Sequence, residues 1–122
     1  MTSDQLLAAL AEADGAALGV GAFAPGTAVW AGRREVAHVH GDALELRLTK
    51  AEIRRRRAEL AADERVVLRP GASDWIEVAL TDDTGQARAL ELGRRAVELN
   101  RATAPPGPPP TGPDLARRRR FH

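Results

Sequence analysis

The hydrophobic pattern is most regular between residues 34 and 48, where apolar and polar side chains alternate. Side chains of a β-strand point alternately to its two faces, so this pattern predicts two strands with one apolar and one polar face. Gly41-Asp42 suits a tight type II′ turn and predicts an antiparallel hairpin. In this register Val39 faces Leu44 and Ala37 faces Leu46 on the apolar side, whereas His40 faces Ala43, His38 faces Glu45 and Val36 faces Arg47 on the polar side.

The rest of the chain predicts further elements around this hairpin. Helical spacing of apolar residues, with capping residues before them, predicts helices over about 5–13, 50–62 and 84–101. Apolar runs predict strands over 27–30, 65–69 and 74–80, while residues 16–26 are small, glycine-rich and turn-like. We therefore expect an α+β fold: a small, mostly antiparallel sheet with helices packed on one face and the polar side of the hairpin on the other.

Proline and arginine set the last residues apart from the rest. Residues 105–113 read PPGPPPTGP, which suits neither a helix nor a central strand and predicts an extended linker. We divide the chain into a domain over 1–104 and a disordered tail over 105–122. Four arginines and one aspartate give the tail a charge of +3, which leaves −2 on residues 1–104. Because phosphate binding needs positive charge, nucleic acid is expected only at Arg117, Arg118, Arg119 and Arg120.

Composition excludes several classes of protein. Cysteine is absent, so there is no disulfide framework, thiolate metal site or cysteine nucleophile. The N-terminus lacks the pattern of a signal peptide, and no segment approaches the roughly 20 apolar residues that span a bilayer. We expect a cytoplasmic protein without a membrane partner.

The polar side of the hairpin carries the candidate chemistry, in His38, His40, Glu45 and Arg47. Three interpretations remain open. In the first, the residues form a solvated sheet face with cross-strand ion pairs. In the second, one histidine is a general base oriented by Glu45, since imidazole titrates near working pH. In the third, His38, His40 and Glu45 are the ligands of a divalent metal ion. A dedicated metal site usually shows a further ligand, so we predict no metal. Trp75 is expected on the same face, either as the wall of a ligand pocket or as a cover over the sheet.

The segment Arg34-Glu35-Val36-Ala37-His38-Val39-His40, followed by a strand of alternating leucines, resembles the luciferase-like domain family. That family includes fungal luciferase and many short bacterial proteins of unassigned function. Asp74–Val78 is similar to the family's acidic-Trp strand and residues 82–99 to its closing helix, so the likeness covers most of residues 28–100. The fungal member oxidises a phenolic hydroxypyrone with molecular oxygen, uses no organic cofactor and emits light.

The resemblance implies that this chain binds a small aromatic or enolisable molecule and oxidises it without an organic cofactor. It implies catalytic roles for His38, His40, Glu45 and Arg34, with a histidine as base and a guanidinium steadying the anion. It implies substrate-binding roles for Arg47, Trp75 and Glu35. Light emission depends on a particular luciferin and is not expected here.

Two departures from the family pattern change what is expected. Residues 63–70 contain no histidine, where many members carry a His-Pro element. The missing histidine and the short chain favour a rival interpretation, a non-enzymatic module that binds a ligand or a protein. Glu35 falls on the apolar side in the predicted register, so either the regular strand begins at Val36 or Glu35 pairs with an arginine at the sheet edge.

Overall fold

The computed structural model describes residues 1–23 and 25–115. The strands of this described part form one open sheet in the order β1-β2-β3-β4-β6-β5, and every neighbouring pair is antiparallel. The strands are β1 Ala16–Val20, β2 Thr27–Ala31, β3 Arg34–His40, β4 Ala43–Arg47, β5 Val66–Leu68 and β6 Trp75–Ala79, and the helices are α1 Ser3–Ala11, α2 Lys50–Arg55, α3 Arg57–Ala62 and α4 Asp83–Arg101. The predicted α+β class is confirmed.

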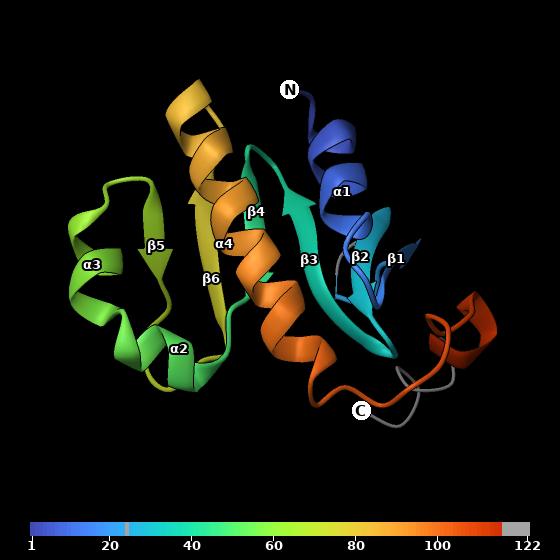
Figure 1. Ribbon diagram of the computed structural model, residues 1–122. Coiled ribbons are helices and arrows are strands. Elements are labelled where there is room, and N and C mark those ends of the chain that lie inside the picture. Colours follow the sequence, from blue (N-terminus) through green and yellow to red (C-terminus); the bar gives the residue numbers. More distant parts are fainter. Residues whose placement is uncertain (24, 116–122) are drawn as a thin grey trace.

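One face of the sheet, here called the helix face, is covered by α4 and α1. Figure 1 shows α4 crossing the middle strands, with α1 beside it over the β1–β2 end. Gly93 of α4 leaves room for the Leu10 side chain of α1, because a Cβ at position 93 would lie 2.7 Å from Leu10 Cδ2. The fully buried side chains between the two layers include Leu6, Leu10, Leu44, Leu46, Ile76, Val78 and Leu92.

The β3–β4 hairpin has the predicted register from the turn as far as Ala37 and Leu46. Beyond that point the expectation is wrong, because β3 contains a bulge against β2. Val29 pairs with Ala37 and the next residue, Trp30, pairs with Glu35, so Val36 is the extra residue. The bulge turns Val36 into the helix-face core and moves Glu35 to the opposite face. Neither explanation offered for Glu35 from the sequence holds.

Two further elements differ from the sequence prediction. The helix expected over 50–62 is interrupted at Arg56, whose backbone leaves the helical region at φ −105° and whose side chain pairs with Glu59 at 2.6 Å. The turn-like segment after α1 contains an edge strand, β1.

The helix layer is tied together by Glu52, which accepts hydrogen bonds from Arg55 and Arg95; these partners lower the pKa of its carboxyl to about 2.

The described part of the proline-rich tail lies against the sheet. Arg33 N–H donates to Pro105 O at 2.9 Å, and Leu115 packs, 3% exposed, with Ala28 and Trp30. Arg117, Arg118, Arg119 and Arg120 lie outside the described residues, and the division at residue 104 stays a prediction. Within the described part, no helix has the length and apolar character needed to cross a membrane.

Candidate functional site

The sheet face opposite the helices, here called the polar face, brings together side chains from β3, β4 and β6. His38 lies at its centre with a side chain only 4% exposed, and its Nε2 lies 3.0 Å from Glu45 Oε2 on the neighbouring strand. Arg69, just beyond β5, donates to the same carboxylate oxygen at 2.7 Å. The predicted cross-strand pair of His38 and Glu45 is therefore present, with Arg69 as an additional partner.

This arrangement decides which imidazole nitrogen is basic. The Glu45 carboxylate, paired with Arg69, is an acceptor, so it favours the tautomer with the proton on Nε2 of His38. The lone pair then lies on Nδ1, which is buried and has no hydrogen-bond partner among the described residues. A carboxylate that fixes a histidine in this way leaves the other nitrogen free to accept a proton.

Glu35 lies next to the free nitrogen of His38. Its Oε1 is 3.9 Å from His38 Nδ1, too far for a hydrogen bond, and its side chain is fully buried. Burial raises the pKa of the Glu35 carboxyl above its ordinary value of 4.5, although His38, the N–H groups of Ala22 and Phe23, and Arg47 oppose this. Both N–H groups donate to the carboxyl at 3.2 Å, so Glu35 holds the β1–β2 loop over the polar face.

Aromatic rings and a guanidinium cover the site. The Trp75 ring lies 5.3 Å from the His38 ring, and the Arg47 guanidinium carbon lies 4.9 Å from the Trp75 ring centre. Phe23, from the β1–β2 loop, meets Trp75 edge-on at 5.6 Å, yet the residue is 65% exposed. Arg47 also donates through Nε to Glu35 O at 2.9 Å and lies 5.8 Å from the Phe23 ring centre. The guanidinium therefore has aromatic rings as neighbours as well as a fixed backbone contact.

Two of the predicted site residues do not join this cluster. The His40 side chain is 74% exposed, and its Nδ1 lies 3.9 Å from Glu45 Oε1. Arg34 donates to Thr103 Oγ1 at 2.8 Å, just past the end of α4. The structure thus brings together His38, Glu45, Glu35, Arg47 and Trp75, with His40 at the rim and Arg34 directed toward the end of α4.

Two residues of the cluster were not found from the sequence. Arg69 reaches Glu45 because β5 pairs with β6 and β6 pairs with β4, an order that local patterns do not show. Phe23 lies in a glycine-rich loop that folds back over the sheet. The signal for the loop was indirect: a buried carboxylate at position 35 requires hydrogen-bond donors, and the loop supplies them.

A metal site was one of the alternatives left open by the sequence. Among residues 1–23 and 25–115, no group of three or more His, Asp or Glu side chains is arranged to hold a metal ion. His38 Nε2 faces Glu45 directly, and the closest approach of His40 to that carboxylate is 3.9 Å.

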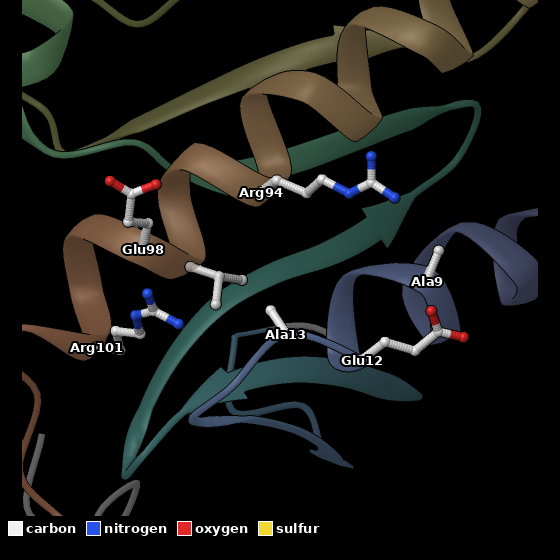
Figure 2. A pocket seen from close by; sticks show the side chains of 7 residues that line it. Ala9, Glu12, Ala13, Arg94, Glu98 and Arg101 are labelled. Carbon is white, nitrogen blue, oxygen red and sulfur yellow. The ribbon is translucent and has the colours of Figure 1, made fainter.

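A separate cavity lies on the helix side of the molecule, between α1 and α4 (Figure 2). Its volume is about 350 Å³. Figure 2 shows Arg94 and Glu98 on α4, Ala9 on α1 and Glu12 just after α1 around it. Its lining consists of Ala9, Glu12, Ala13, Arg94, Val97, Glu98 and Arg101, so it shares no residue with the polar face.

Comparison with known proteins gives one match. Residues 33–96, just over half of the 122-residue chain, match the family described as the luciferase domain. No curated protein and no solved structure matches the chain. The matched segment begins just before the His-x-His strand and ends within α4, so it contains His38, Glu45, Arg69 and Trp75.

Proposed function

Because this chain belongs to the luciferase domain family, we propose that its polar face binds a small aromatic or enolisable molecule and accepts a proton from it. The observation that supports this most strongly is the hydrogen-bonded row Arg69–Glu45–His38, which leaves the buried His38 Nδ1 without a partner among the described residues. Most buried side-chain nitrogens have a hydrogen-bond partner, so the unpartnered Nδ1 of His38 supports a role as proton acceptor. Glu45 favours the tautomer that leaves the lone pair on this atom.

The ligand's acidic hydroxyl takes a position between His38 Nδ1 and the Glu35 carboxyl. These two groups are 3.9 Å apart, so an oxygen about 2.8 Å from each can donate its proton to Nδ1 and accept a hydrogen bond from the protonated Glu35 carboxyl, the form that burial favours. The hydroxyl proton moves to Nδ1, and Glu45 stabilises the imidazolium that results. The ligand becomes a delocalised anion beside Arg47, whose positive charge favours that form.

The ring of the ligand takes the place that Phe23 now occupies. Phe23 meets Trp75 at 5.6 Å and lies 5.8 Å from the Arg47 guanidinium carbon, contacts that any flat ring can make. Because Phe23 is 65% exposed, displacing it uncovers little apolar surface that water does not already reach. Trp75 is then both a cover over the sheet and a wall for the ligand.

Binding is tested with a hydroxypyrone and its O-methyl ether, using the fluorescence of the two tryptophans. The hydroxypyrone should quench the fluorescence saturably, whereas the ether should bind at least about tenfold more weakly, because it has no proton to give. Trp75→Phe should remove most of the quenching and leave the emission of Trp30. Equal binding of the two compounds would contradict proton transfer, and the absence of saturable quenching would contradict binding.

Arg69→Gln tests the role of the hydrogen-bonded row without emptying the core, because the Arg69 side chain is 37% exposed. Without the guanidinium the Glu45 carboxylate is held less firmly, and hydroxypyrone affinity should fall about tenfold. The matched control is Arg54→Gln, an exposed arginine on α2, which should leave affinity unchanged.

The family likeness extends the proposal to oxidation of the bound anion by molecular oxygen, with no organic cofactor. An oxygen electrode tests this step with the hydroxypyrone and the wild-type protein. Oxygen uptake that Arg69→Gln slows would establish an oxidising enzyme. Saturable binding of aromatic ligands without oxygen uptake for any of them would favour the alternative, a non-enzymatic ligand-binding module.

A further inference from the structure

The two edges of the sheet are protected to different degrees. β5, at one edge, spans three residues and is flanked by Arg65, Arg69 and Pro70. Short length, charge and proline are the usual means by which an edge strand avoids pairing with another chain. β1, at the other edge, has five residues, AALGV, with neither a charge nor a proline. Only the β1 edge lacks these protective features in the described sheet.

The backbone groups of β1 alternate between β2 and the outside. Gly21 N–H donates to Gly26 O at 2.8 Å, so the odd-numbered residues of this stretch face β2. The even-numbered residues Ala16, Leu18 and Val20 therefore direct their N–H and C=O groups away from the sheet. Within the described chain, no hydrogen bond joins the outward groups of Leu18 or Val20 to another residue.

Apolar side chains accompany these unpaired backbone groups. Leu18 is 45% exposed and Val20 is 54% exposed, and both lie on the helix side of the strand, since Ala17 and Gly19 face the opposite side with Trp30. α1 covers only the inner part of this edge (Figure 1). A further strand would therefore satisfy the backbone of β1 and cover two apolar side chains at once.

We infer that β1 pairs antiparallel with β1 of a second copy of this chain, about a two-fold axis at Leu18. In this register Leu18 faces Leu18 of the second copy, and Val20 faces Ala16. The flanking Asp14 faces Ala22 of the second copy, so no like charges meet. β1 carries no charge that would favour a partner of opposite charge. Its apolar side chains can instead pack against the same side chains of a second copy, as a two-fold contact requires.

The predicted dimer is weak and depends on concentration. Pairing of two five-residue strands buries less surface than the roughly 1,200–2,000 Å² of a stable protein–protein interface. Ala16 contributes only its carbonyl, because its N–H already donates to Ala13 O at 3.0 Å.

Sedimentation of the full chain over a concentration series tests the dimer. The wild type should convert from monomer to dimer as concentration rises, and Leu18→Lys should weaken dimerisation at least about tenfold, because it places two like charges opposite each other. The matched control is Val67→Lys on β5, where the replaced residue is 54% exposed, compared with 45% for Leu18; it should leave the equilibrium unchanged. A wild type that stays monomeric up to about 1 mM would overturn the proposal, as would equal effects of the two substitutions.

Cross-linking tests the register, since the chain contains no cysteine. Leu18→Cys places two thiols at a hydrogen-bonded strand pair, where the Cα–Cα distance of about 5.5 Å suits a disulfide. Mild oxidation should give a disulfide-linked dimer. Val20→Cys puts the thiols four residues apart along the ladder, about 13 Å, and should not cross-link. Cross-linking of Val20→Cys but not Leu18→Cys would overturn the two-fold at Leu18.

The residues after Leu115 are the rival occupant of this edge, because Leu115 packs against β2, the neighbour of β1. Truncation after Leu115 separates the two possibilities. An unchanged monomer–dimer equilibrium supports pairing with a second copy. A dimer that appears only in the truncated chain would show that the tail occupies the edge, and would overturn the proposal.

Discussion

The two faces of the sheet are both closed at their centre, but by different means. On β4, Leu44 and Leu46 are fully buried against the helices, while Glu45 between them is 13% exposed on the opposite face. The helix face is closed by apolar packing, which is favourable without further partners. The polar face is closed by hydrogen-bonded ionisable groups. Removing ionisable groups from water costs free energy, whereas removing apolar side chains from water does not. The comparison teaches that apolar burial on the helix face is the main source of stability, and that the polar face, where we propose the chemistry, keeps ionisable groups that cost free energy to bury.

The largest expected effect lies on the helix face. Leu44→Ala removes a fully buried side chain and leaves a cavity, so the free energy of unfolding should fall by about 2–5 kcal/mol in urea denaturation. Glu77→Ala, on the polar face of the adjacent strand, is the matched control and should cost less than about 1 kcal/mol, because its side chain is 35% exposed. Similar losses in the two variants would contradict the division of roles between the faces.

An intermediate effect, dependent on pH, is expected at Glu35. Glu35→Gln leaves one of the N–H groups of Ala22 and Phe23 without an acceptor, which costs about 1–3 kcal/mol. The pKa of Glu35 is raised in the folded chain, so the folded state binds this proton more tightly than the unfolded state. The stability that this proton gives the wild type is therefore present at low pH and lost as pH rises from about 4.5 through the raised pKa.

Urea denaturation of wild type and Glu35→Gln across that pH range measures the effect. The difference in stability between them should shift in favour of the variant as pH rises. A difference that moves the other way would mean that the ion pairs of Glu35 outweigh its burial.

The smallest expected effect is at His40, the exposed histidine of β3. His40→Ala should change the free energy of unfolding by less than about 0.5 kcal/mol, because its side chain is 74% exposed. His38→Ala leaves Glu45 without its 3.0 Å partner and empties a buried position, and should cost about 2–3 kcal/mol. Equal costs in thermal or urea unfolding would show that burial does not distinguish the pair.

The sequence was sufficient for the parts of the fold that local patterns determine. The turn at Gly41-Asp42 and the alternation around it predicted the pairing of His38 with Glu45, and capping residues predicted the start of α4. β1 was missed because AALGV does not alternate between polar and apolar residues and resembles a small-residue loop. The bulge at Val36 was missed because its cause lies in β2, a partner that the hairpin pattern does not include.

The candidate site was predicted only as far as the alternation of side chains along single strands extends. His38, Glu45, Arg47 and Trp75 share the expected face because strand alternation places them there. Arg34 was placed with them by family resemblance, whereas the structure directs it to Thr103. Arg69 and Phe23 depend on the strand order and on a loop that folds back, both of which are set by the whole chain.

The most direct test of the central claim is the ultraviolet spectrum of a bound hydroxypyrone, because the enol and its anion absorb differently. The spectrum is recorded with excess protein at a pH where the free compound is still protonated. We predict the spectrum of the anion for the wild type, and a return toward the protonated form in Arg69→Gln under conditions where the compound stays bound. A wild-type spectrum identical to that of the protonated compound would contradict proton transfer to His38.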